Sequence, residues 1–279
     1  MGDVSVSILI LTYNEEVNIG HCLASVAWSD DIVVLDSHST DRTGEVALAA
    51  GARLVRREFD HYAGQRTFGL TQIAFRHPWV LMLDADERVP EALREEMVKV
   101  VAAVDSGVTL LQLRRRDHLF GKWIRGSSGY PTWFGRLARV GHVRVERPIN
   151  EEYHTDGRIE RLHHALEHYP FNKGFSEWIR KHDRYSTMEA ELIVAGWRQP
   201  IEWTGLVSRD PARRRKQLKA LLYRVPGRPL IMFLSLYLLR GGVLEGRAGL
   251  TFSLLRAWYE FMIDCKTREL RRRVAGQSL

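Results

Sequence analysis

The chain has 279 residues, of which 45% are hydrophobic and 27% are charged, and this balance excludes wholesale disorder. A chain of this length buries most of its apolar surface without covalent staples. The two cysteines, Cys22 and Cys265, lie near opposite ends and form no CxxC motif. This excludes a disulfide scaffold and a zinc ribbon, and it is typical of a reducing compartment.

The positive charge is concentrated in the C-terminal quarter. The formal net charge is +7, and residues 209–228 contain eight basic side chains against one acidic side chain. A second basic stretch, 266–273, contains five, so the remainder of the chain is mildly acidic. Such a segment indicates an anionic partner, which can be membrane lipid, nucleic acid or a phosphorylated acceptor. We expect no signal peptide, and no apolar run reaches the ~18 residues of a spanning helix.

The first third of the chain alternates apolar strands with amphipathic helices. Strands buried on both faces, each followed by a helix, predict a parallel, doubly wound α/β sheet. The expected strands are Val6–Leu11, Asp31–Leu35, Arg53–Arg56, Trp79–Leu83 and Val108–Leu113, and the expected helices are Glu16–Val26, one beginning at Ser39, Gln65–Phe75 and Pro90–Val104.

The pattern becomes irregular after Leu113, and we expect loops and short strands over a cleft up to Tyr169. Helical periodicity returns at Ser176–Ile193 and again over about 229–239 and 243–264. We therefore predict two parts: residues 1–200 as the α/β domain, and residues 201–279 as a basic, amphipathic helical region.

Two carboxylates follow the fourth expected strand, in Asp84-Ala85-Asp86. Ligands of open parallel sheets bind at the carboxyl ends of the strands, and Mg²⁺ or Mn²⁺ often takes only one or two protein carboxylates. A blander interpretation of this motif on its own is a helix-start cluster in which Asp86 caps the following helix.

Polar residues follow the neighbouring strands in the same way. Thr12, Asn14 and Glu15 follow the first strand, Asp36 follows the second, and Arg66 precedes the fourth. An acidic residue at a strand end can bind a base or ribose hydroxyls, and an arginine can contact a diphosphate. Each residue could also be a helix cap or a solvated side chain, and only their order along an alternating α/β pattern makes the group specific.

In this arrangement, residues Ile8 to Val89 resemble the family 2 glycosyltransferases of GT-A fold. The resemblance implies that Thr12, Asp36 and Arg66 contact a nucleoside diphosphate, and that Asp84 and Asp86 bind ribose and metal. We assign the metal to Asp86, and ribose or a supporting role to Asp84. Many members have Lys-Asn where this chain has Arg66-Thr67, which keeps the charge and changes the second side chain.

The later part of the chain resembles the lipopolysaccharide-core β-glucosyltransferase subgroup. The resemblance rests on Leu119–Arg125, Gly129-Tyr130-Pro131, His168-Tyr169 and the Gly241-Gly242…Glu245-Gly246…Gly249 spacing. The subgroup has Val-His-Glu where this chain has Ile149-Asn150-Glu151. It implies a UDP-sugar donor, with UDP-glucose as the subgroup's expectation, and a lipid-linked saccharide acceptor.

Transfer from a nucleotide sugar needs one base to remove the proton of the acceptor hydroxyl, since the diphosphate is already a good leaving group. Glu151 is the first candidate and Glu152 the next; alternatively, both belong to a solvated acidic loop. Attack opposite the diphosphate inverts the anomeric centre. The aromatic residues Trp123, Tyr130, Trp133 and Phe134 either stack on sugar rings or form a core patch, and we interpret His168 as structural.

The C-terminal helices predict contact with an anionic membrane surface. Residues 243–264 place Leu244, Ala248, Phe252, Leu255, Tyr259 and Met262 on one helical face, beside the basic stretch. The alternatives are a core helix and a dimer interface. The favoured hypothesis locates the protein peripherally at the cytoplasmic face of a bacterial inner membrane.

Three other functions stay open at this point. The same fold serves polyprenyl-phosphate and capsule or exopolysaccharide glycosyltransferases, whose phosphate acceptors need no base. A sugar nucleotidyltransferase would need a Gly-rich basic loop after the first strand, and Thr12–Glu16 is acidic. Nucleic-acid binding has only the basic stretch in its favour, without an RNP motif or zinc finger, and we do not expect it.

Overall fold

The computed structural model describes residues 6–146, 152–195, 202–208, 213–214, 217, 221, 225 and 227–279. The chain divides into two compact units. Unit 1 comprises 1–125 and 130–174, and unit 2 comprises 126–129 and 175–279. The boundary that we predicted near residue 200 therefore lies within unit 2.

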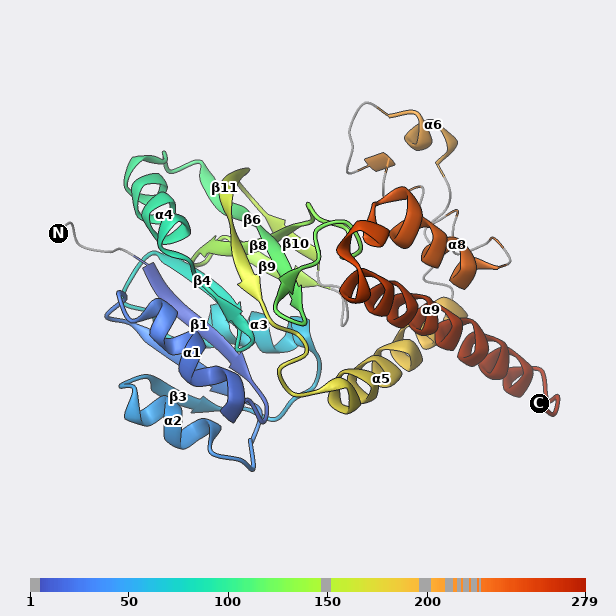
Figure 1. Ribbon diagram of the computed structural model, residues 1–279. Coiled ribbons are helices and arrows are strands. Elements are labelled where there is room, and N and C mark those ends of the chain that lie inside the picture. The colour runs from blue at the N-terminus through green and yellow to red at the C-terminus, as the bar shows by residue number, and fades with distance from the viewer. Residues whose placement is uncertain are drawn as a thin grey trace. The chain divides into compact units, whose positions relative to one another are not determined.

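Unit 1 begins with the alternating pattern that the sequence predicted (Figure 1). Its parallel strands are adjacent in the order β3-β2-β1-β4. The elements are β1 (Val6–Thr12), α1 (Glu16–Val26), β2 (Ile32–Asp36), α2 (Thr43–Ala49), β3 (Arg53–Arg56), α3 (Tyr62–Gln72), β4 (Trp79–Asp84), β5 (Glu87–Arg88) and α4 (Glu91–Ala103).

The second half of unit 1 contains more strand than we predicted. The expected strand Val108–Leu113 continues to Leu119, and β8 lies antiparallel between β4 and β6. Short strands joined by loops occur here as predicted, but β6 and β11 are long strands that the prediction missed, because their later residues are arginines and histidines rather than apolar residues. These strands are β6 (Val108–Leu119), β7 (Lys122–Trp123), β8 (Trp133–Arg139), β9 (Val143–Glu146), β10 (Glu152–Thr155) and β11 (Arg158–His168).

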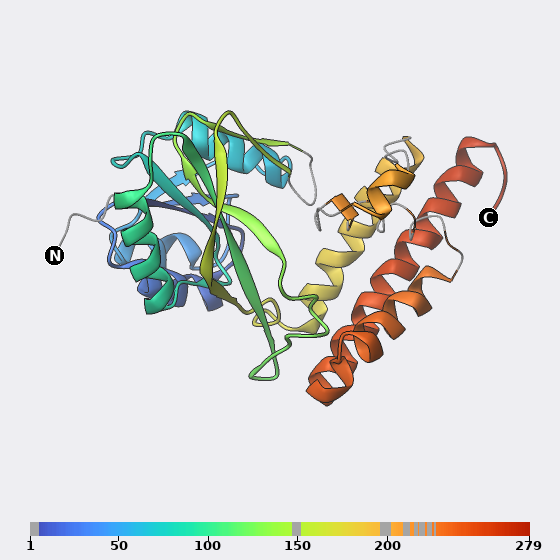
Figure 2. The same cartoon turned by 90° about the horizontal axis from the view of Figure 1, so that it is seen from above.

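Both faces of the sheet are covered, as expected for strands that are apolar throughout. Successive residues of β1 point to opposite faces: Ile8 and Ile10 join one buried cluster and Leu9 the other. The first cluster includes side chains of α1, α2 and α4, and the second includes those of α3 and β9. Figure 2 shows α1 and α4 on one side of the sheet and α3 on the other. This packing fixes the strand ends that carry the polar residues.

Unit 2 is helical in its described part. Its elements are α5 (Phe175–Val194), α6 (Trp203–Leu206), α8 (Arg228–Leu234), the π-helical turn η1 (Ser235–Leu239), the 3₁₀ turn η2 (Gly242–Glu245) and α9 (Arg247–Val274). The long helix α9 packs against both α5 and α8. Arg228, buried at the start of α8, pairs with Glu260 at 2.9 Å and Asp264 at 3.1 Å. This buried ion pair joins α8 to α9.

The face of α9 that we predicted to contact membrane is largely buried within unit 2. Ala248, Phe252 and Tyr259 of that face are buried, and Gly249 and Glu260 outside it are buried as well. Helical periodicity alone cannot tell a lipid-facing stripe from one that faces neighbouring helices. Here α5 and α8 cover that stripe, so the core-helix alternative holds for these residues.

The segment Gly126–Gly129 packs in unit 2, although the chain on both sides of it belongs to unit 1. Glu245 at the end of η2 accepts hydrogen bonds from the backbone N–H of Gly126 and Ser127 and from the Ser127 hydroxyl. A Cβ at Gly126 would lie 2.0 Å from the carbonyl oxygen of Arg240. The close approach explains why this position has no side chain.

Candidate functional site

The ends of β1 and β2 carry the first group of predicted site residues. Thr12 and Asp36 are register partners, and the Thr12 hydroxyl donates to Asp36 Oδ1 at 2.9 Å. Asp36 also accepts hydrogen bonds from the backbone N–H and the hydroxyl of Ser39. Asn14, at a φ of 51°, donates its backbone N–H to Ser39 Oγ and accepts from the N–H of Thr40. The structure therefore brings Thr12, Asn14 and Asp36 together, and their mutual bonds hold two adjacent loops.

Glu15 lies at the end of the first loop, beside the chain that follows β11. Lys173 donates to Glu15 Oε1 at 3.0 Å and to the carbonyl of Tyr13 at 3.1 Å. Burial, followed by the nearby negative charge of Asp86, raises the pKa of Glu15 above its ordinary value. Lys173 therefore places a cation beside the Glu15 carboxylate at this edge of the sheet, and the sequence did not single it out.

Asp84, the last residue of β4, is held by two buried arginines. Arg66 of α3 donates to Asp84 Oδ1 and Arg136 of β8 donates to Asp84 Oδ2, both at 2.8 Å. Charge-assisted bonds of this kind are about twice as strong as neutral ones. Both carboxylate oxygens of Asp84 therefore face guanidinium groups, and the side chain is oriented by α3 and β8.

Glu87 extends this network inward. Its side chain is fully buried, accepts the backbone N–H of Asp84 at 2.9 Å, and pairs with Arg136 at 2.7 Å and Arg115 at 3.6 Å. Burial alone would lower the pKa of Arg136, but Asp84 and Glu87 raise it well above its ordinary value. Arg136 is therefore charged at any pH that the protein meets.

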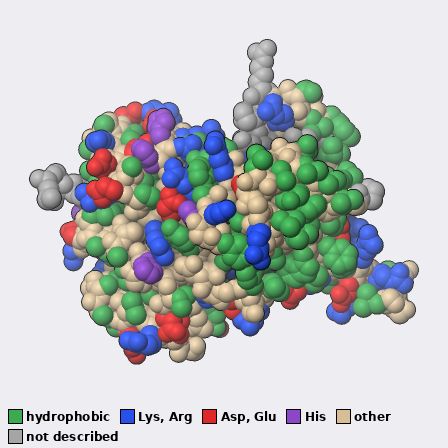
Figure 3. All heavy atoms as spheres, viewed as in Figure 1, with side chains coloured by type: hydrophobic (Ala, Val, Ile, Leu, Met, Phe, Trp, Pro, Cys, Tyr) green, Lys and Arg blue, Asp and Glu red, His purple; other side chains and the backbone are tan. Residues whose placement is uncertain are grey.

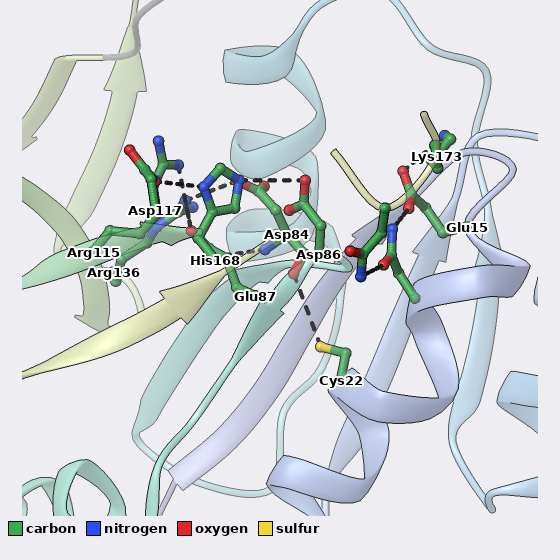
Figure 4. Close-up of polar contacts among 12 residues, drawn as sticks. Glu15, Cys22, Asp84, Asp86, Glu87, Arg115, Asp117, Arg136, His168 and Lys173 are labelled. Carbon is green, nitrogen blue, oxygen red and sulfur yellow. Dashed lines mark hydrogen bonds and ion pairs between the residues drawn. The ribbon is translucent and has the colours of Figure 1, made fainter. Parts of the chain in front are cut away.

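His168, the last residue of β11, connects the network to Asp86. Its Nδ1 lies 2.6 Å from Asp117 Oδ1 and its Nε2 lies 3.3 Å from Asp86 Oδ2 (Figure 4). Asp117 in turn pairs with Arg115 at 3.0 Å. Burial and Arg115 lower the pKa of His168, but Asp86 and Asp117 raise it to a net value of about 9. The imidazole therefore carries a proton at neutral pH in this arrangement.

Asp86 and His168 are of residue types that bind divalent cations. Asp117 accepts from Nδ1 of His168, which directs Nε2 towards Asp86, and such a carboxylate–histidine pair orients many metal-ligating histidines. Asp86 and His168 would hold the ion, and the nucleotide and water would supply the remaining ligands. No group of three or more His, Cys, Asp or Glu side chains with metal-binding geometry occurs among the described residues. At such a site the protein would supply two ligands, one oxygen from Asp86 and one nitrogen from His168 after its proton is released.

The candidate base Glu151 lies outside the described residues. Glu152 begins β10 and is half-buried, with Glu146 of β9 as its register partner. The Thr67 hydroxyl donates to the carbonyl of Val145 at 3.1 Å and so ties β9 to α3, next to Arg66. The β9–β10 connection that contains Glu151 therefore starts and ends on strands anchored beside the Arg66–Asp84 pair.

Sequence reasoning missed five residues of the network: Glu87, Arg115, Asp117, Arg136 and His168. Glu87 directly follows the acidic motif, so its position was a usable signal. The other four lie on β6, β8 and β11, more than 28 residues from the motif, and their approach depends on strand register. The interpretation of His168 as only structural overlooked its contact with Asp86.

A mixed sheet flanked by helices, with an acidic pair at the end of its fourth strand, defines a glycosyltransferase of GT-A type. The chain belongs to glycosyl transferase family 2, whose model matches residues 7–175, more than half of the chain.

Two relatives and one solved structure agree with this assignment. The chain is 29% identical over 269 residues to the lipopolysaccharide core biosynthesis glycosyltransferase LpsC of Rhizobium meliloti, covering 93% of this chain and 90% of the relative. An uncharacterized glycosyltransferase of Rickettsia bellii is 24% identical over 95% of this chain and 86% of its own length. The mannosyltransferase PcManGT of Pyrobaculum calidifontis, solved with GDP-Man and Mn²⁺, is similar in fold, with a TM-score of 0.54 and 18% identity over 94% of this chain and 86% of that chain.

Proposed function

We propose that the chain is an inverting glycosyltransferase that moves a sugar from a UDP-sugar to a lipopolysaccharide-core or other lipid-linked glycan. The observation that carries the proposal is the polar edge at β1, β2 and β4: Thr12 ends β1, which pairs with β4 on one side and with β2, ending at Asp36, on the other. The similarity to a lipopolysaccharide core glycosyltransferase over most of the chain supports the acceptor class.

In the proposed reaction, the chain's own residues bind the donor and move one proton. Thr12, Asn14, Glu15 and Asp36 hold the nucleoside end, and Arg66 lies beside the diphosphate. Glu151, with Glu152 as the alternative, accepts the proton of the acceptor hydroxyl as its oxygen bonds to the anomeric carbon. The bond from that carbon to the diphosphate breaks, and the configuration inverts. A bound divalent cation would stabilise the negative charge that develops on the diphosphate.

We infer that Mn²⁺ serves better than Mg²⁺. Mg²⁺ prefers oxygen ligands in near-ideal octahedral geometry, whereas the protein offers a carboxylate from Asp86 and an imidazole from His168. A mixed nitrogen and oxygen pair favours the softer ion.

Calorimetric titration of UDP and GDP in the presence of Mn²⁺, Mg²⁺ or chelator tests the donor and the metal. We expect UDP to bind more tightly than GDP, and more tightly with Mn²⁺ than with Mg²⁺. Asp86→Asn should remove the cation dependence. Asp105→Asn, the same change before β6 at the opposite edge of the sheet, should retain it. Absence of UDP binding under every condition would refute the proposal.

The base is tested by product formation from UDP-glucose and purified lipopolysaccharide core. Glu151→Gln should lower kcat by about 10²–10⁴, the usual contribution of a general base. Near-full activity of Glu151→Gln together with low activity of Glu152→Gln would assign the base to Glu152. Near-full activity of the double variant Glu151→Gln/Glu152→Gln would contradict a glutamate base and would favour an acceptor that is already anionic at the attacking atom.

We further propose that unit 2 contacts an anionic membrane peripherally. No helix in the described ranges is both long enough and apolar enough to cross a bilayer. Hydrophobic side chains gather over the α8–α9 part of unit 2 (Figure 3). The exposed ones are Leu230, Ile231, Leu234, Leu238, Leu239, Val243, Leu244, Leu250, Leu254 and Phe261. Basic residues adjoin them in the sequence, which is the combination that favours an anionic interface.

Vesicle co-sedimentation tests this part. The protein should bind phosphatidylglycerol-containing vesicles and not pure phosphatidylcholine vesicles. Leu239 and Leu244 are 84% and 89% exposed, and their joint change to Ser should weaken binding about tenfold or more. Leu48→Ser in unit 1, at a residue that is 59% exposed, is the matched control and should bind normally. Equal binding by all three proteins would contradict the assignment.

A further inference from the structure

Three arginines and three aromatic rings of unit 1 form a continuous series of contacts, which we call the arginine–aromatic ladder. Arg161 and Arg114 lie 5.0 and 5.1 Å from the Trp133 ring, and Arg114 lies 5.6 Å from the Tyr130 ring. Tyr130 meets Trp123 edge to face at 5.1 Å, and Arg116 lies 4.9 Å from Trp123. The ladder therefore consists of Arg161, Trp133, Arg114, Tyr130, Trp123 and Arg116, from four strands and one loop.

The ladder carries positive charge that the described part of the chain does not neutralise. Arg116 pairs with Glu167 at 3.0 Å. Within the described residues, Arg114 and Arg161 form no ion pair, and Arg161 has only a hydrogen bond to the Gln112 side chain at 3.2 Å. Stacking on aromatic rings holds guanidinium groups in place without consuming their hydrogen-bond donors.

The position of the ladder is set by strand alternation. Arg115 and Asp117 of β6 belong to the charge network around Asp84 and Asp86, so Arg114 and Arg116 point to the opposite face of the sheet. The β9–β10 hairpin packs on that opposite face, where a Cβ on Gly135 of β8 would lie 2.9 Å from the Tyr153 ring. The connection between β9 and β10 contains Glu151, the proposed general base. The ladder thus shares its face of the sheet with the element that holds the candidate base.

A shallow hollow opens at one end of the ladder. It is lined by Gln112, Ile159, Glu160 and Arg161. Glu160 and Arg161 are the charged residues of this lining. Arg114 lies over the same Trp133 ring as Arg161 and adds a second positive charge beside the hollow.

We propose that the ladder binds an anionic sugar of the acceptor, one that carries a phosphate or a carboxylate group. This inference rests on the proposed function, because it names the acceptor class of that same enzyme. Arg114 and Arg161 present planar donor forks on either side of Trp133, and such forks match the paired oxygens of phosphate and carboxylate groups. Surface lysines would attract the same charge without that geometry. The ladder therefore selects for an acidic sugar over a neutral one.

The test is a titration of isotopically labelled protein followed by the indole N–H signals of Trp123 and Trp133. The donor site is first filled with UDP and Mg²⁺, which are diamagnetic, and filling is verified by calorimetry. The probes are glucose, glucose 6-phosphate and glucuronic acid. We expect one or both anionic sugars to shift the Trp133 signal, and glucose to leave it unchanged. The two anionic probes distinguish phosphate from carboxylate recognition.

Two variants complete the design. Arg114→Gln combined with Arg161→Gln should weaken binding of the anionic sugar by about tenfold to hundredfold, as for lost charge-assisted hydrogen bonds. Arg94→Gln, the same change on α4, should bind as the unmodified chain does. Both variants should bind UDP normally, which shows that unit 1 is folded.

The outcomes separate the inference from the function on which it rests. If UDP binds and the Trp133 signal ignores both anionic sugars, or responds equally to glucose, the inference is wrong and the glycosyltransferase proposal stands. Unchanged affinity in the double variant would also overturn it. If UDP does not bind to the unmodified chain, the proposed function itself fails.

Discussion

Glu87→Gln is a sharp test of whether the buried charge network stabilises unit 1. Glu87 is fully buried and accepts two hydrogen bonds, one from Arg136 and one from the backbone N–H of Asp84. A glutamine of the same shape offers one oxygen to two donors, so its amide N–H₂ group must face either the guanidinium or the N–H. The substitution also leaves Arg136 and Arg115 with less negative charge around them.

The expected magnitude follows from this geometry. Removing one partner of a buried ion pair costs about 3–5 kcal/mol, because the remaining charge stays buried without compensation. We therefore expect Glu87→Gln to lower the free energy of unfolding of unit 1 by about 3–5 kcal/mol. Glu95→Gln is the matched control on α4, where the side chain is exposed. It should change stability by no more than about 0.5 kcal/mol.

Urea unfolding followed by tryptophan fluorescence measures both variants, since Trp79 is buried in the core of unit 1. The double variant Glu87→Gln/Arg136→Met removes both charges. It should be less destabilised than the sum of the single changes by about 1–3 kcal/mol, which is the coupling expected for residues in contact. If Glu87→Gln unfolds at the same urea concentration as Glu95→Gln, the network does not stabilise the fold.

Three further outcomes are expected. Burial lowers the pKa of His182 from 6.5 to about 3, so between these pH values the unfolded chain binds a proton at this residue and the folded chain does not. The free energy of unfolding should therefore fall by up to about 1.4 kcal/mol per pH unit as the pH falls from 6.5 towards 3. Urea titrations of His182→Gln should lack this contribution to the slope. Glu245→Ala should speed tryptic cleavage after Arg125, because Gly126 and Ser127 lose their acceptor; an unchanged rate, measured by mass spectrometry, would show that Glu245 does not hold the segment. His168→Asn should weaken Mn²⁺-dependent UDP binding about 10–100-fold by calorimetry, and equal affinity would exclude the imidazole as a ligand.

The part of unit 1 from β1 to β4 could be predicted because the sequence patterns that indicate its strands and helices are local. An apolar strand followed by polar residues fixes both the element and the end at which the polar groups emerge. The expected strand Arg53–Arg56 matches β3 and the expected helix Glu16–Val26 matches α1. Since parallel strands place their carboxyl ends at one edge, the position of Thr12, Asp36 and Asp84 at the same edge of the sheet follows from the order of the elements alone.

The partners of Asp84 and Asp86 could not be predicted in the same way. Arg136 reaches Asp84 because β8 lies antiparallel between β4 and β6, and His168 reaches Asp86 because β11 pairs with β5. A shift of one residue in either register would turn these side chains to the opposite face. Register in this part of the sheet depends on bulges in β11 and on neighbours far along the chain, which no local pattern encodes.

The two aspartates of one short motif consequently have different chemistry. Asp84 ends β4 and directs both oxygens to guanidinium groups from α3 and β8, whereas Asp86, two residues later, faces the imidazole at the end of β11. For Asp84 to ligate a cation directly, it would have to give up a charge-assisted hydrogen bond to a buried arginine, and that arginine would then be left without its partner. Asp86 faces a side chain that can release its proton and become a ligand itself. The fold therefore gives the two aspartates different surroundings, two guanidinium groups for Asp84 and one imidazole for Asp86, and these surroundings support the separate roles that we propose for them.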